Sequence, residues 1–183
     1  MHGLVPAVTA AKAIGGEQMV MNMRARFAAA PGWNGGHHYG SAAMSTFMTS
    51  VRVETLKRYG IEAQLASQYP DPARREEAIW KVSERWAKQF DPHSMIALSA
   101  ARAHFDAEKD FAKIRAKVLY VLSRTDKLFP PTLAPAVMEK LKRDGVDADY
   151  FEIDSDKGHL ASGADWAKWA ARLSAFLARL PQG

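Results

Sequence analysis

A chain of 183 residues is long enough for one domain with a sizeable hydrophobic core. Its composition, 48% hydrophobic and 25% charged, is ordinary for a globular protein, and no apolar run is long enough to cross a bilayer. The absence of cysteine excludes disulfides, thiolate metal sites and a cysteine nucleophile, and it agrees with the cytoplasmic location that we expect.

The basic character of the chain is the first feature that could point to a partner. The net charge is +5 and the pI is about 9.5, values that are typical of proteins binding nucleic acids or anionic membranes. Here, however, acidic residues are interleaved with the basic ones, and no cluster of basic and aromatic side chains stands out. We therefore expect solvated helix faces, with neither a nucleic acid nor a membrane as partner.

The chain opens on a short apolar stretch, Leu4–Val8. The wider segment Met1–Gly16 is mildly apolar, but Pro6 interrupts it and no basic segment precedes it, so we do not interpret it as a signal peptide. Chains rarely begin inside a buried strand. We therefore interpret residues 1–10 as the first core strand of a sheet whose earlier strands have been lost.

Residues 11–115 show a helical pattern throughout. Two pairs, Asp71-Pro72 and Asp91-Pro92, each combine an N-cap with proline at the first helical position. Another helix is predicted over Ala42–Tyr59, ended by Gly60. Apolar residues recur at helical spacing after the first Asp-Pro pair, at Ile79, Val82, Trp86 and Phe90. We interpret this stripe as core packing rather than a cofactor surface.

Residues 116–183 change to an alternation of strands and helices. Val118–Leu122 and Asp149–Asp154 are predicted strands, separated by a helix over Thr132–Arg143. A capping-box-like segment, Ser162–Asp165, is expected to start a last helix. Its apolar stripe comprises Trp166, Trp169, Ala170, Leu173, Phe176, Leu177 and Leu180. The alternation indicates parallel strands with helical crossovers.

Two titratable residues follow the predicted strands directly. Asp126 comes after the first strand of this segment and His159 after the second, and sites in parallel sheets gather at the carboxyl ends of the strands. In acyl-transfer chemistry a histidine takes and returns a proton while a buried aspartate orients its ring. The chain order, Asp then His, is that of the last two members of an α/β-hydrolase triad. The alternative is a turn aspartate and a surface-loop histidine.

No metal site is expected. The neighbours His37 and His38 diverge on most backbones and have no acidic or cysteine partners at ligand spacing, so we interpret them as surface residues. His93 and His104 have no partner pattern either.

Several segments together resemble the homoserine O-acetyltransferase family of α/β-hydrolases, including its esterase-like relatives. The segments are Leu4–Pro6, Pro31–Gly36 with Tyr39, Asp126–Pro131, and Glu152–Ser155 with Gly158-His159. Arg24 stands where that family has an arginine in its helical lid. The match runs in order along almost the whole chain and resembles the second half of the family's proteins.

The resemblance implies an α/β fold: the C-terminal part of an α/β-hydrolase, with three parallel strands and flanking helices, plus an all-helical lid over residues 11–115. By position, Asp126 and His159 would be the catalytic acid and base. Arg24 and Tyr39 would line the substrate pocket, where a cation and a phenol can bind a carboxylate; the alternatives are a solvated helix residue and a packed aromatic. The substrate would be a small-molecule ester or acyl compound, without a cofactor, and the lid would be the contact of a homodimer.

The chain departs from the family pattern in two places. No G-x-S-x-G occurs, and Ser41 lacks the strand-turn-helix context of a nucleophile. Leu160 follows the histidine where the acetyltransferases commonly have an aspartate that can pair with a substrate amine. We therefore expect an esterase-like hydrolase, represented by a fragment or truncated frame that is inactive alone. The alternatives are a homoserine O-acetyltransferase using acetyl-CoA, and a catalytically dead remnant acting as a binding or dimerisation module.

Overall fold

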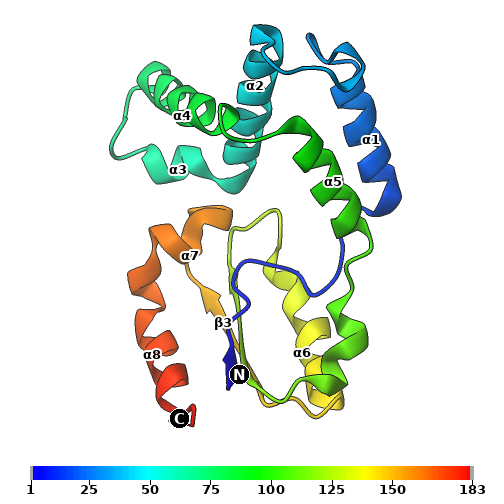
Figure 1. Cartoon of the computed structure of the whole chain (residues 1–183). Coiled ribbons are helices and arrows are strands. Elements are labelled where there is room, and N and C mark those ends of the chain that lie inside the picture. Colours follow the sequence, from blue (N-terminus) through cyan, green and yellow to red (C-terminus); the bar gives the residue numbers. More distant parts are fainter. Residues whose placement is uncertain (1, 182–183) are drawn as a thin grey trace. The chain divides into compact units, whose positions relative to one another are not determined.

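The computed structural model describes residues 2–181, so Met1, at the start of the expected first strand, and Gln182 and Gly183 at the other end lie outside it. The chain divides into two compact units (Figure 1). We call the first, residues 2–12, 58–64 and 106–181, the core unit. The second, residues 13–57 and 65–105, is the helical unit.

The core unit contains a sheet of three parallel strands in the order β1-β2-β3. They are β1, Gly3–Leu4; β2, Lys117–Ser123; and β3, Ala148–Ile153. This confirms the expected three parallel strands, but the first is shorter than the predicted Leu4–Val8. Pro6 has no N–H to donate to the ladder, and Val8 has a φ of 46°, outside the extended region. The pairing resumes as a single bridge between Ala7 and Val121.

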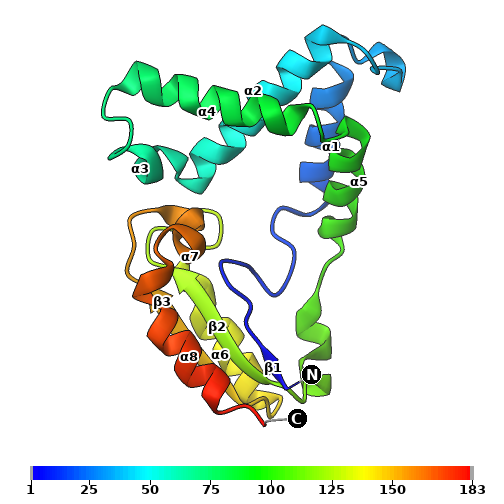
Figure 2. The same ribbon diagram turned by 60° about the vertical axis from the view of Figure 1, so that its left-hand side comes forward.

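Helices cover both faces of this sheet, which explains why β2 is a continuous apolar run (Figure 2). Successive side chains of a strand point to opposite faces. On one face Val118, Tyr120 and Leu122 pack against α6, Ala134–Arg143. On the other face Leu119 and Val121 pack with Phe176 of α8, Ala170–Ala178. The short helix η2, Ala107–Lys113, adds Phe111 to the first cluster.

The expected single helix after Ser162 is wrong. The segment instead forms α7, Ala161–Ala164, a 3-10 turn η5, Trp166–Lys168, and then α8. Asp165 does not serve the capping box, because its carboxylate binds Ser155 and Lys157 in the preceding loop. Trp166 at the break is 65% exposed.

The helical unit is built from α1, Gly16–Ala28; α2, Ala42–Tyr59; α4, Pro72–Ala87; and α5, Pro92–Ala103, with a 3-10 turn η1, Asn34–Gly36. A further short helix, α3, spans Ile61–Leu65. The last residues of α2 and most of α3 belong to the core unit. Both Asp-Pro caps are confirmed: Asp71 accepts from the backbone N–H of Arg74, and Asp91 accepts from those of His93 and Ser94.

One apolar cluster holds the helical unit together. Its buried members are Phe27, Ala30, Met44 and Met48, and Trp33, Phe47, Trp86 and Phe90 pack against them. The predicted stripe on α4 is correct for Ile79 and Trp86 but wrong for Val82, which is 48% exposed. Between residues 2 and 181, no helix combines the length and the apolar character needed to cross a membrane.

Candidate active site

Asp126 lies in the loop that follows β2, with a side chain completely removed from solvent. The loop is closed locally, because Asp126 Oδ1 accepts hydrogen bonds from the backbone N–H groups of Leu128 at 2.8 Å and Phe129 at 3.1 Å. The Asp126 N–H in turn donates to the carbonyl of Ser123, the last residue of β2. One carboxylate oxygen is therefore satisfied by the loop itself, and Oδ2 is left for a partner elsewhere.

That partner is His159, in the 3-10 turn η4, Gly158–Leu160, after β3. Asp126 Oδ2 lies 2.9 Å from His159 Nδ1. A carboxylate accepts this bond from Nδ1–H, and in a neutral imidazole with its proton on Nδ1 the other nitrogen, Nε2, carries a free lone pair. Nε2 has no hydrogen-bond partner within residues 2–181, and the side chain is 16% exposed. The arrangement can therefore present a proton acceptor to a reacting group.

Two aromatic rings flank the imidazole of His159. The ring centroid of Tyr59 lies 4.5 Å away and that of Phe129 5.5 Å away, both tilted against the histidine. Tyr59 is the last residue of α2, and sequence reasoning used it only as a helix end. The sequence feature that could have pointed to this contact is the glycine after Tyr59. Gly60 has a φ of 96°, and a Cβ on it would lie 2.8 Å from the carbonyl oxygen of Lys157.

A partly buried network of hydrogen bonds and ion pairs holds the other side of the His159 loop. Ser155 Oγ donates to Asp165 Oδ2 at 2.6 Å and accepts from the backbone N–H of Lys157. Lys157 Nζ donates to Asp165 Oδ1 at 2.5 Å, and Lys168 adds a longer ion pair. The hydrogen bonds from Lys157 and then from Ser155 lower the pKa of Asp165 to about 2. The carboxylate is therefore ionised at neutral pH and stabilises the turn that presents His159.

The structure places Arg24 and Tyr39 in the helical unit, where they line different hollows. Arg24 is exposed on α1 and makes no hydrogen bond or ion pair within residues 2–181. Tyr39 is 74% exposed, so it is not a packed aromatic. Its hydroxyl donates to Asp91 Oδ2 at 3.0 Å, and this hydrogen bond raises the pKa of Tyr39.

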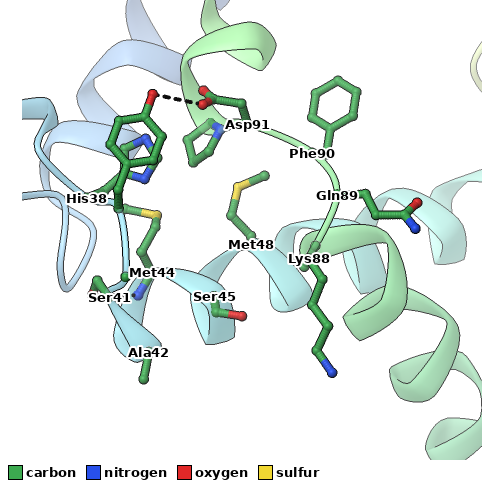
Figure 3. Close-up of a pocket in the computed structure, with 14 residues that line it drawn as sticks. His38, Ser41, Ala42, Met44, Ser45, Met48, Lys88, Gln89, Phe90 and Asp91 are labelled. Atoms are coloured by element: carbon green, nitrogen blue, oxygen red, sulfur yellow. Dashed lines mark hydrogen bonds between the residues drawn. The ribbon is translucent and has the colours of Figure 1, made fainter.

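Tyr39 lines an open hollow of about 500 Å³ formed by the start of α2 and the segment before α5 (Figure 3). The sulfur-containing side chains of Met44 and Met48 lie at its base, and Lys88 and Gln89 lie at its edge. The expectation that His38 is a surface residue is wrong: it is only 5% exposed and stacks on Trp33. No group of three or more metal-ligating side chains occurs in the described part of the chain.

Comparison with known proteins places these features in context. No protein-family model matches the chain. Homoserine O-acetyltransferase from Haemophilus influenzae is 24% identical over 166 residues, which cover 81% of this chain and 46% of that protein. Serine O-succinyltransferase from Xanthomonas campestris pv. campestris is 27% identical, covering 81% and 48%. The chain thus spans about half the length of the curated relatives it matches.

Solved structures also match the fold of this chain. The crystal structure of homoserine O-acetyltransferase from Bacillus anthracis matches with a TM-score of 0.79 at 18% identity, covering all of this chain and 55% of that one. The structure of esterase E22 matches with a TM-score of 0.74 at 15% identity, covering 97% and 54%. The expected fold class and the expected resemblance are both confirmed.

Proposed function

Because the chain is homologous to homoserine O-acetyltransferases and has the α/β-hydrolase fold, we propose that Asp126 and His159 are the acid and base of a serine-dependent acyl-transfer site. The observation that carries the proposal is the 2.9 Å contact between a fully buried carboxylate and an imidazole whose Nε2 has no other partner in residues 2–181.

The chemistry follows from this geometry. His159 Nε2 removes the proton from a nucleophilic hydroxyl as the oxygen attacks the acyl carbonyl, and it returns that proton to the leaving group. Asp126 stabilises the imidazolium that forms between these two transfers. Water, deprotonated by the same nitrogen, then attacks the acyl-enzyme, and the imidazolium returns this proton to the hydroxyl oxygen of the nucleophile as the acid is released.

We propose no nucleophile among these 183 residues. The chain has no G-x-S-x-G, and Ser41 Oγ caps α2 by accepting from the backbone N–H of Met44. The serine and the oxyanion hole would come from a further stretch of polypeptide, as the lengths of the relatives suggest. The purified chain should therefore lack esterase activity. A measured rate that disappeared in Ser41→Ala would contradict this assignment.

The proposed substrate is a small-molecule acyl ester, with water as the acceptor. Leu160 follows the base directly, and an apolar side chain cannot pair with the ammonium group of an amino-acid acceptor. Arg24 and Tyr39 line different hollows, and each is proposed as a separate candidate for binding a substrate carboxylate. Residues 11–115 are proposed to form a lid and the contact of a homodimer. The competing proposal is that the chain is not catalytic and acts as a binding or dimerisation module.

The second candidate function is acyl transfer from acetyl-CoA to homoserine, which the names of the relatives favour. One assay separates the two. This chain is co-expressed with the N-terminal half of a relative, and we call the resulting complex the complemented protein. It is supplied with an acyl donor in the presence and absence of homoserine, and the products are followed by mass spectrometry. Free acid alone supports the hydrolase; O-acetylhomoserine supports the transferase and would contradict the argument from Leu160.

The experiment that tests the proposed function is complementation. The chain is co-expressed with the N-terminal half of the Haemophilus influenzae relative, and p-nitrophenyl acetate hydrolysis is measured on the copurified complex. We expect activity in the complex, none in either half, and a loss of roughly 10⁴-fold or more in His159→Ala and in Asp126→Asn. A complex whose rate is unchanged by these substitutions would refute the acid and base roles.

A further inference from the structure

Thr125, directly before the buried acid, connects the two loops of the candidate site. Its Oγ1 donates a hydrogen bond to the carbonyl of Ser155 at 2.8 Å and accepts one from the backbone N–H of Gly158 at 3.1 Å. The Thr125 hydroxyl is thus both a donor and an acceptor, and both of its partners lie in the loop that carries His159. Thr125 precedes Asp126 and Gly158 precedes His159, so the second of these bonds joins the residues directly before the acid and the base.

Other contacts between these loops lie farther from the acid–base pair. The backbone N–H of Arg124 donates to the carbonyl of Ile153 at 3.1 Å, which continues the strand ladder. The side chain of Arg124 pairs with Asp154, but both groups are largely exposed, and such pairs add little. Apart from the Asp126–His159 contact itself, the bond between Thr125 Oγ1 and the Gly158 N–H is the hydrogen bond within residues 2–181 that joins a neighbour of Asp126 to a neighbour of His159.

The backbone at Gly158 leaves little freedom to compensate for a lost bridge. Gly158 has a φ of 57°, and a Cβ built on it would lie 3.1 Å from the carbonyl oxygen of Tyr59. The backbone of this residue therefore packs closely against the end of α2. Because Gly158 N–H points at Thr125, loss of the acceptor would leave a backbone donor unsatisfied next to the base.

We propose that Thr125 is a positioning residue that sets the separation and orientation of Asp126 and His159 through its two hydrogen bonds. Its β-branched side chain has few rotamers, so the hydroxyl is held in one direction at small entropic cost. The catalytic meaning of this role rests on the proposed function. The effect of Thr125 on the Asp126–His159 hydrogen bond, however, can be measured without an activity assay.

The test compares Thr125→Val, which keeps the shape and removes the hydroxyl, with Thr125→Ser, which keeps the hydroxyl. Thr55→Val is a matched control, because Thr55 Oγ1 makes only a local bond to the carbonyl of Val51 within α2. The readout is the His159 side chain in ¹⁵N-labelled protein: the Nδ1–H resonance and the tautomer shown by the two ring nitrogens.

In the parent chain, in Thr125→Ser and in Thr55→Val, we expect a protected Nδ1–H resonance and one tautomer. In Thr125→Val we expect the resonance to broaden or disappear through exchange and the second tautomer to appear. An unchanged resonance in Thr125→Val, or an equal loss in Thr125→Ser, would overturn the proposal. If Thr125→Val shows no cooperative melt, Thr125→Ala replaces it. Loss of the Nδ1–H resonance in Thr125→Ala would then support the proposal, and an unchanged resonance would overturn it.

Kinetics of the complemented protein separate this inference from the proposed function. In Thr125→Val we expect kcat to fall about tenfold to hundredfold with KM little changed, as for a small misplacement of catalytic groups, and Thr125→Ser to restore it. If the resonance changes but His159→Ala does not affect the rate, the proposed function fails and the positioning stands. If His159→Ala abolishes the rate but Thr125→Val changes neither readout, the function stands and this inference fails.

Discussion

The two loops of the candidate site are held in different ways. The Asp126 loop is closed by local hydrogen bonds of the Asp126 carboxylate and backbone, which span at most three residues. The His159 loop depends on groups outside the loop: Asp165, which follows it in the chain, and the distant Thr125 and Tyr59-Gly60 backbone. The first set of bonds needs partners within one short segment, whereas the second loop needs partners that the folded core brings to it. Substitutions far from His159 should therefore affect it, and few should affect Asp126.

The largest effect on stability is expected for Gly60→Ala. The substitution places a Cβ at a φ of 96°, with the carbonyl oxygen of Lys157 2.8 Å away, so backbone strain and a backbone clash add. We expect a loss of about 2–4 kcal/mol in the free energy of unfolding. Urea denaturation measures it.

Gly145→Ala is the matched control for that substitution. Gly145 has a φ of 77°, but a Cβ on it would meet nothing within 4 Å. It should cost only the strain of the left-handed backbone, about 1–2 kcal/mol. Equal losses for the two variants would show that the approach of Gly60 to the His159 loop has no energetic importance.

The next largest effect concerns Asp165 and depends on pH. Its pKa falls from 3.8 to about 2 in the folded chain, so the stabilisation is complete above about pH 4 and is lost as the pH falls through about 2. Asp165→Asn should cost roughly 1–2 kcal/mol at pH 7 and should make stability less dependent on pH between 4 and 2.

Asp156 provides the control in the same loop, because it is exposed and has no hydrogen bond or ion pair within residues 2–181. Asp156→Asn should leave stability within about 0.5 kcal/mol of the parent. Denaturation across pH compares the two variants; the network account is wrong if they behave alike.

A smaller effect is expected at Tyr59. Replacing Tyr59 by leucine keeps an apolar side chain but removes the aromatic contact with His159 at 4.5 Å, which should cost about 0.5–1.5 kcal/mol. Tyr59→Phe keeps the ring and should be nearly neutral, since no hydrogen bond of the Tyr59 hydroxyl occurs in residues 2–181. If Tyr59→Phe were as unstable as Tyr59→Leu, the stabilising contribution of Tyr59 would come from its hydroxyl and not from its ring. Thermal melts are sufficient to tell them apart.

The smallest effect is expected for the exposed ion pair between Arg124 and Asp154. The side chains are 54% and 86% exposed, so water and salt screen the charges. Arg124→Met should change the free energy of unfolding by less than about 1 kcal/mol. A larger loss, measured at low and at high salt, would mean that this pair and not Thr125 connects the loops.

The same contrast explains what the sequence allowed us to predict. Asp126 and the strand before it are recognisable because an apolar run, a turn and two prolines lie next to one another. The Asp71 and Asp91 caps are local for the same reason. Asp165 was misassigned, because its partners Ser155 and Lys157 precede it by eight to ten residues and follow no helical period. The burial of His38 depends on Trp33 and His93, which only the fold brings together.

The claim that His159 and Asp126 activate a serine is tested most directly by labelling. The complemented protein is treated with a fluorophosphonate, which reacts with a serine only when a base activates it, and the rate of labelling is followed by mass spectrometry. We predict rapid labelling of one serine in the half that complements this chain, slowed at least about 10³-fold in His159→Ala and in Asp126→Asn. Labelling at the same rate in the parent complex and both variants would contradict the account.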